Sequence, residues 1–138
     1  MKIAVLQQYA PVTYNRDKEL PSLEELKRRS EASVNRCLEL IKEAASMGAE
    51  LCVTIETVNA YIALGDTRFK YTDTLEGDTV RLFSEAARLY KMHIVAGLAL
   101  AFDGVPYNCA VLFDDTGAVV GVHKKVHLPA GEDRKSVV

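Results

Sequence analysis

The sequence predicts an α/β fold in which a mixed β-sheet is flanked by helices. Strand and helix patterns alternate in the order β-α-β-α-β along most of the chain, which is typical of layered α/β folds. Two turn signals then separate the last three apolar runs, which predicts antiparallel strands added to the same sheet. The 138 residues are 49% hydrophobic and 26% charged, as expected of one soluble domain with a sizeable core.

The first strand is predicted at residues 2–8, and a long helix is predicted from Ser22 onward. A polar loop over 9–21 separates them. Ser22 is a typical helix N-cap, Glu25 follows three residues later as in a capping box, and Gly48 is a typical C-terminal stop. Apolar residues recur between these signals on one helical face. They are Leu23, Leu26, Val34, Cys37, Leu38, Ile41 and Ala45.

The remaining elements are predicted from apolar periodicity and turn chemistry. They are a buried strand at 51–55, a helix capped by Asp78 or Thr79 and ending near Lys91, and strands at 93–100, 107–113 and 118–125. Asp103-Gly104 and the segment 114–117 are the turn signals between the last three strands. Residues 59–75 show no clean period and are predicted to form a loop.

Composition excludes several classes of function. Lys and Arg number 17 against 19 Asp and Glu, so the net charge of −2 gives no electrostatic footprint for nucleic acid. The apolar runs are far too short to span a bilayer, and the N-terminus lacks the apolar stretch and cleavage site of a signal peptide. Neither a phosphate-loop motif nor a glycine-rich dinucleotide turn occurs. Three cysteines without CxxC spacing favour a reduced, cytoplasmic compartment.

The histidines and cysteines predict neither a metal site nor a nucleophile. His123 and His127 have the spacing of a helical metal pair, but they flank the end of a predicted strand and no further ligand completes a set. Two partly exposed histidines are therefore expected, without a metal. Cys37, Cys52 and Cys109 lie on an apolar helix face or in strands, so we expect buried, unpaired thiols that pack as small hydrophobic side chains.

Three segments in a fixed order carry a resemblance to a known family. Glu56 follows the strand at 51–55, and the strand at 107–113 begins with Tyr-Asn-Cys-Ala. Residues 121–129 then read Gly-Val-His-Lys-Lys-Val-His-Leu-Pro. In this order and spacing the segments resemble the nitrilase superfamily of carbon–nitrogen hydrolases, over residues 2 to about 133.

The resemblance implies that the chain forms half of an α-β-β-α sandwich. Residues 1–138 would then be a single and apparently incomplete domain. Family members act through a cysteine on a strand well beyond the lysine, so the nucleophile is expected outside this chain. The apolar inner face of the sheet must then pack against another part of the protein or a second chain, because a soluble monomer rarely exposes so large an apolar surface. We expect the chain to continue, to pair with its missing C-terminal half, or to associate with itself as a homo-oligomer.

The same resemblance implies roles for three residues. Glu56 is the general base that takes the thiol proton and later hands it to the leaving group. Lys125 stabilises the negative charge of the tetrahedral intermediate. Glu132 holds Lys125 in position or helps to activate water. The implied substrate is a small molecule with an amide, N-carbamoyl or nitrile group, and no cofactor is implied.

The two principal residues are expected to share one site. Both end strands of the same sheet in the family pattern, so we expect Glu56 and Lys125 at one end of it, with their charged atoms within one ion-pair or water-bridge length. Lys124 is expected on the opposite face and in solvent, because successive side chains of a strand alternate.

Two further interpretations stay open at this point. A truncated or degenerate copy of the fold would bind or scaffold without catalysis. An unrelated α/β ligand-binding domain would have a pocket with no acid near Lys125. Within the hydrolases, amidase, N-carbamoyl hydrolase and nitrilase also stay open, because specificity rests on pocket shape and a few polar contacts.

Overall fold

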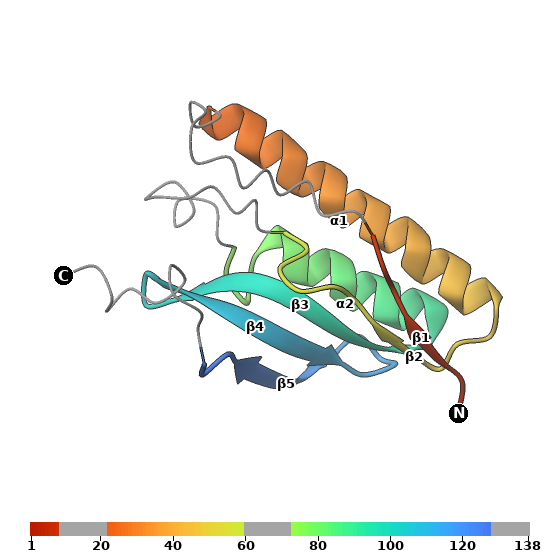
Figure 1. The fold of residues 1–138 in the computed structure, drawn as a ribbon. Helices are drawn as coiled ribbons and strands as arrows, with labels where there is room; N and C mark the ends of the chain where they lie inside the picture. The colour runs from red at the N-terminus through yellow and green to blue at the C-terminus, as the bar shows by residue number, and fades with distance from the viewer. Residues whose placement is uncertain (9–21, 60–72, 128–138) are drawn as a thin grey trace.

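A computed structural model describes residues 1–8, 22–59 and 73–127 of the chain. Within these ranges the elements follow the predicted order of β-α-β-α-β and then a β-meander (Figure 1). They are β1 (Ile3–Val5), α1 (Leu23–Ser46), β2 (Leu51–Val53), α2 (Asp78–Tyr90), β3 (His93–Phe102), β4 (Val105–Phe113) and β5 (Val119–Lys124). The predicted α/β class is confirmed.

The strands form a mixed sheet in the order β1-β2-β3-β4-β5. β1, β2 and β3 run parallel, whereas β4 pairs antiparallel with both β3 and β5. β5 therefore runs in the same direction as β2. Because strands that run in the same direction have their C-terminal ends on one side, the residues after β2 and after β5 lie at the same end of the sheet.

Both helices pack on one face of this sheet (Figure 1). Phe83 of α2 stacks on Phe113 of β4 with ring centroids 6.3 Å apart, and both rings are fully buried. Burying a side chain of this size contributes about 1.5–3 kcal/mol. The buried helix residues are Leu26, Val34, Cys37, Ile41 and Ala44 in α1 and Val80, Phe83, Ala86 and Ala87 in α2. Neither helix of the described residues is long and apolar enough to cross a membrane.

The ends of α1 follow the predicted signals. The Ser22 hydroxyl accepts the N–H of Glu25 at 3.2 Å, as an N-cap does. Gly48 adopts a φ of +78° just after the helix, a conformation that suits glycine. The Glu25 carboxylate does not close a capping box on the preceding turn. It accepts hydrogen bonds from Arg28 and Arg29 one turn further along.

The start of α2 differs from the prediction. Gly77 is the N-cap, so neither Asp78 nor Thr79 caps the helix. The carboxylate of Asp73 replaces a side-chain cap, because it accepts the N–H of Thr79 at 2.7 Å. An acid ahead of the helix thus satisfies one of its free N–H groups. The helix ends where expected, with Lys91 in the left-handed conformation at φ +48°.

Three strands are shorter than predicted. β1 covers Ile3–Val5 rather than 2–8, β2 stops at Val53 rather than at residue 55, and β5 covers Val119–Lys124 rather than 118–125. The N–H of Gly97 in β3 donates to the hydroxyl of Thr54 and not to a β2 carbonyl, so the ladder stops there. The two turns form as expected. Asp103 and Gly104 have φ values of +51° and +74°, and Gly117 has +87°.

The face of the sheet away from the helices is apolar. Val5, Val53, Val95 and Leu112 pair with one another across four strands on this face. Val5 is 77% exposed, because no helix of the described residues packs here. We call these four residues the open apolar face.

Candidate active site

Glu56 stands just beyond the end of β2, and the backbone before it is tied to β3. The N–H of Thr54 donates to the carbonyl of Val95 at 3.0 Å. The Thr54 hydroxyl accepts the N–H of Gly97 at 3.0 Å and donates to the carbonyl of Ile55 at 3.0 Å. One hydroxyl thus fixes the peptide that carries Glu56.

Gly97 lets this peptide approach β3 closely. A Cβ at position 97 would lie 2.3 Å from the carbonyl oxygen of Ile55 and 2.8 Å from the Cα of Glu56. No side chain fits at such distances, so glycine is required by the approach of the backbone. Sequence analysis did not single out Gly97. An isolated glycine inside a strand pattern is the signal that identifies such a contact.

The chain after Glu56 turns sharply and is held on the same strand. Thr57 has a φ of +52°, which is strained for a β-branched residue and persists only where the surroundings enforce it. Val58 donates its N–H to the Gly97 carbonyl at 2.8 Å. The buried Asn59 side chain binds both backbone groups of Ala99, at 2.8 and 2.9 Å. The backbone is therefore fixed on both sides of Glu56.

Lys125 follows β5 and extends its pairing with β4. Its N–H donates to the carbonyl of Asn108 at 2.8 Å. The preceding Lys124 points to the other face, where its Nζ lies 3.8 Å from the ring centroid of Phe102 and 4.4 Å from that of Tyr107. The predicted opposite orientation of the two lysines is confirmed. Lys124 is exposed, as expected, and forms cation–π contacts there.

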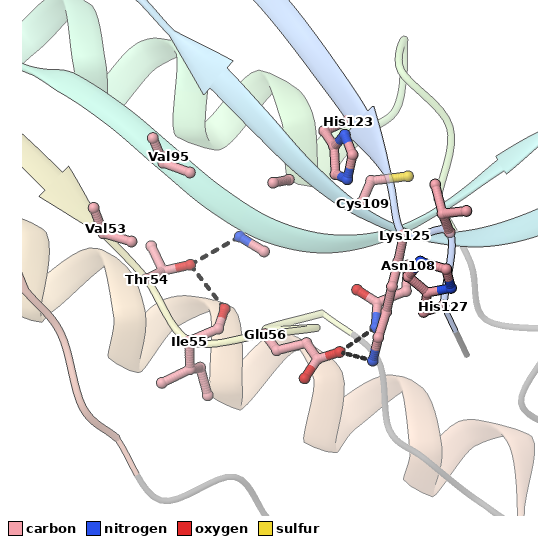
Figure 2. A pocket seen from close by; sticks show the side chains of 13 residues that line it. Val53, Thr54, Ile55, Glu56, Val95, Asn108, Cys109, His123, Lys125 and His127 are labelled. Atoms are coloured by element: carbon pink, nitrogen blue, oxygen red, sulfur yellow. Dashed lines mark hydrogen bonds and ion pairs between the residues drawn. The ribbon is translucent and has the colours of Figure 1, made fainter. Parts of the chain in front are cut away.

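Glu56 and Lys125 meet at the end of the sheet (Figure 2). The Nζ of Lys125 donates to Oε1 of Glu56 at 2.7 Å, although 69 residues separate them in sequence. The Nδ2 of Asn108 donates to the same oxygen. The predicted proximity of the two charged groups is confirmed. The interpretation as a ligand-binding domain without an acid near Lys125 is therefore wrong.

This arrangement lowers the pKa of Glu56. The hydrogen bond from Lys125 is the main cause, and the hydrogen bond from Asn108 and the lysine charge act in the same direction. Partial burial opposes them, since it disfavours the charged form. The Glu56 side chain is 59% exposed and that of Lys125 is 32% exposed. At neutral pH Glu56 is therefore an ionised carboxylate, which is the form that accepts a proton.

The pair lies in a pocket of about 650 Å³ on the face away from the helices. Its apolar walls include Val53, Ile55 and Val95, which come from β2, the residues just after it and β3. A pocket with apolar walls and a few convergent polar groups is the usual form of a small-molecule site.

The two histidines are exposed beside this pocket. His123 lies in β5 and His127 lies beyond it, and both contribute to the pocket lining (Figure 2). Within the ranges 1–8, 22–59 and 73–127, no three His, Cys, Asp or Glu side chains gather in a way that would hold a metal ion.

All three cysteines are buried and free, as predicted. Burial raises the thiol pKa of Cys37 to about 12 and that of Cys52 to about 11. Burial also raises the pKa of Cys109, although Lys124 opposes the shift. Cys109 also borders the pocket, but it adjoins Asn108 on β4, so strand alternation turns its side chain toward the helix-covered core and away from Glu56. None of the three presents a thiolate to Glu56.

Some predicted features lie outside the described residues. Glu132, the third predicted site residue, is one of them. The predicted loop at 9–21 and most of the predicted loop at 59–75 are the others. The sequence prediction did not include Asn108 as a partner of Glu56, although Asn108 lies in the Tyr-Asn-Cys-Ala segment that carries the resemblance.

Comparison with known sequences gives a consistent family. The sequence model of the carbon–nitrogen hydrolases matches residues 2–138. Nitrilase homolog 2 of Dictyostelium discoideum is 37% identical over 101 residues, which cover 71% of this chain and 30% of that protein. Omega-amidase NIT2-A of Xenopus laevis is 32% identical over 98 residues, or 70% and 35% of the two chains. The matched region thus spans about a third of the length of these curated relatives.

Solved structures show the same fold. A carbon–nitrogen hydrolase from Helicobacter pylori superposes with a TM-score of 0.71 at 20% identity, covering 93% of this chain and 40% of that chain. An amidase from Nesterenkonia sp. gives a TM-score of 0.70 at 19% identity, covering 96% and 45%. The five-stranded sheet with its two helices therefore corresponds to less than half of each of these chains.

Proposed function

This chain belongs to the carbon–nitrogen hydrolase family, and we propose that it supplies the base and the cation of a hydrolase that cleaves non-peptide carbon–nitrogen bonds. The contact of 2.7 Å between Glu56 and Lys125 in the pocket carries this proposal. The carboxyl ends of strands are where open α/β sheets place their sites. A carboxylate with a shifted pKa and a specific charge partner in a cleft is typical of a functional site.

In the proposed mechanism Glu56 takes the proton of a cysteine thiol, because the thiolate is the nucleophile. The thiolate attacks the carbonyl carbon of the substrate, and Lys125 stabilises the negative charge that develops on the oxygen. Glu56 then passes the proton to the leaving nitrogen. Water hydrolyses the resulting thioester, and Glu132 holds Lys125 in position or helps to activate that water.

We assign the nucleophile to a cysteine outside these 138 residues. The three cysteines of this sequence are buried, and their thiols have raised pKa values. The open apolar face gives a second sheet a surface on which to pack. The chain then acts as one half of an α-β-β-α sandwich, and the completed domain assembles as a homo-oligomer. Free thiols also fit the reducing conditions of the cytoplasm.

A small-molecule amide is the substrate class that we favour. One relative is named an omega-amidase, and one structure with the same fold is an amidase. N-carbamoyl compounds and nitriles are the other substrates of the same mechanism, since each presents an electrophilic carbon bonded to nitrogen. Because the pocket walls are mostly apolar, only a few side chains can bind the polar groups of the substrate.

Two lysine variants test this proposal in the protein expressed from its full reading frame. Ammonia release from small amides, N-carbamoyl compounds and nitriles is the measurement. Lys125→Met is expected to lower kcat/KM by about 10²–10³-fold, because it removes the group that stabilises the developing charge. Lys124→Met is the matched control. It is expected to stay within about twofold of the wild type, since Lys124 points to the other face.

Two results would contradict the proposal. An unchanged kcat/KM in Lys125→Met would remove Lys125 from the mechanism. A wild-type protein that hydrolyses none of the three substrate classes would instead favour a non-catalytic binding or scaffold role for the fold.

A further inference from the structure

Asn108 contacts both charged residues of the candidate site, Glu56 and Lys125. Its side-chain Nδ2 donates to Oε1 of Glu56. Its main-chain carbonyl accepts the N–H of Lys125 at 2.8 Å. The same residue of β4 therefore contacts the carboxylate through its side chain and holds the backbone of the lysine through its peptide group.

The hydrogen bonds divide the carboxylate of Glu56 into two unequal oxygens. Oε1 accepts from both Asn108 and Lys125. Oε2 accepts from no group among the described residues, and in Figure 2 it points away from both donors. A proton that arrives at the carboxylate meets an occupied oxygen on one side and an available one on the other.

We propose that Asn108 is a positioning residue that holds Oε1 of Glu56 beside Lys125 and leaves Oε2 as the oxygen that carries the proton. This inference rests on the proposed function, because it assigns the base to one atom of Glu56. Asn108 touches neither the nucleophile nor the substrate in this role. It acts by restricting rotation of the carboxylate, so that the free oxygen keeps one direction.

An amide suits this position better than other side chains. It donates without carrying a charge, so it does not compete with Lys125 for the carboxylate and does not repel the lysine. The opposite amide orientation would place Oδ1 against the carboxylate oxygen, which is unfavourable, so the donor must face Glu56. An aspartate has the same shape, but it donates no hydrogen bond when ionised and adds a like charge.

The first test measures the titration of Glu56 directly and needs no activity. Glutamate carboxyl carbons are labelled with ¹³C in the protein expressed from its full reading frame, and the Glu56 signal is assigned with Glu56→Gln. Asn108→Ala is expected to raise the pKa of Glu56, because a hydrogen bond to the charged form is lost. The isosteric Asn108→Asp keeps the shape of the side chain and is expected to raise the pKa of Glu56 as well. Asn35→Ala removes an exposed amide from α1 and should leave it unchanged.

The second test separates positioning from folding. In Asn108→Ala, kcat is expected to fall about tenfold, as for loss of one hydrogen bond to a charged group, with KM within about twofold. The acid limb of the kcat/KM profile should move to higher pH with the pKa of Glu56. Asn108→Asp should show the same shift, so a variant that fails to fold does not decide the outcome.

The outcomes distinguish this inference from the function beneath it. A Glu56 pKa that is unchanged in both Asn108 variants overturns the positioning role, whatever the enzyme does. A raised pKa without any loss of kcat also overturns it, since orientation would then not matter. Full activity of Glu56→Gln would instead overturn the proposed function, while the titration would still report the contact between Asn108 and Glu56.

Discussion

Glu25 and Glu56 are both paired carboxylates, but they use their oxygens differently. Arg28 donates to both oxygens of Glu25, at 2.8 and 2.9 Å, and Arg29 adds a bond to Oε1. At Glu56 both donors, Asn108 and Lys125, bind Oε1 alone. Glu25 is thus bonded at both oxygens, whereas Glu56 keeps one oxygen without a donor among the described residues.

The two carboxylates also differ in how far along the sequence their partners lie. The partners of Glu25 lie three and four residues away on one helix. They lower its pKa to about 2, with the hydrogen bond from Arg28 as the main cause. The partners of Glu56 lie 52 and 69 residues away. The first arrangement stabilises a helix locally, and the second brings together a carboxylate, an amide and an ammonium group from both sides of β3.

Neutralising each carboxylate gives the largest expected difference. In the protein expressed from its full reading frame, Glu56→Gln should lower kcat/KM by about 10²–10⁴-fold, as for loss of a general base. Glu25→Gln should leave kcat/KM within about twofold, because its ion pairs join residues of α1 alone and are partly exposed to solvent. Rates of amide hydrolysis, measured at saturating and at limiting substrate concentrations, check both expected values. Equal losses of kcat/KM in the two variants would contradict a special role for Glu56.

A methyl group at Gly97 should displace Glu56 by pushing on its backbone. Its Cβ would lie 2.3 Å from the carbonyl of Ile55, so Gly97→Ala should cost about 1–3 kcal/mol of folding free energy. Activity should fall by about 10²-fold as Glu56 moves. Gly121→Ala is the control, since its Cβ would meet Leu112 at an ordinary 3.8 Å. Denaturant unfolding and kcat/KM measure both variants, and similar values for the two would contradict the role of Gly97.

The pH dependence of stability gives the smallest expected effect. The folded-state pKa of each carboxylate lies below its ordinary value of 4.5, so its pairing stabilises the fold above pH 4.5 and is lost as the pH falls through the folded value. For Glu25 this window runs from pH 4.5 down to about 2. The thermal midpoints of wild type and Glu25→Gln should converge over that window. The thermal midpoints of wild type and Glu56→Gln should likewise converge as the pH falls below 4.5. A difference that does not change with pH would contradict this account.

Local signals made much of the fold predictable. Ser22, Gly48 and the turn at Asp103-Gly104 act within a few residues of chain, so their patterns can be read directly. The cap of α2 was predicted wrongly, because Asp73 reaches it from outside the helix. Strand direction explains why Glu56 and Lys125 meet, and the family resemblance identified both residues.

The contacts that complete the site were harder to predict. Gly97 and Asn108 matter through groups on neighbouring strands, so their roles depend on register rather than on local sequence. Each still leaves a trace in the sequence. Glycine and asparagine are depleted in strands, and each stands here inside an apolar run. Such exceptions within a strand pattern are where functional contacts can be sought.

A double-variant cycle on Glu56 and Lys125 tests most directly whether the two residues form one catalytic unit. kcat/KM is measured for wild type, Glu56→Gln, Lys125→Met and the double variant in the protein expressed from its full reading frame. If the residues act together, the double variant should lose about as much activity as the more damaging single variant. If the two losses multiply instead, Glu56 and Lys125 act independently and the shared site is contradicted.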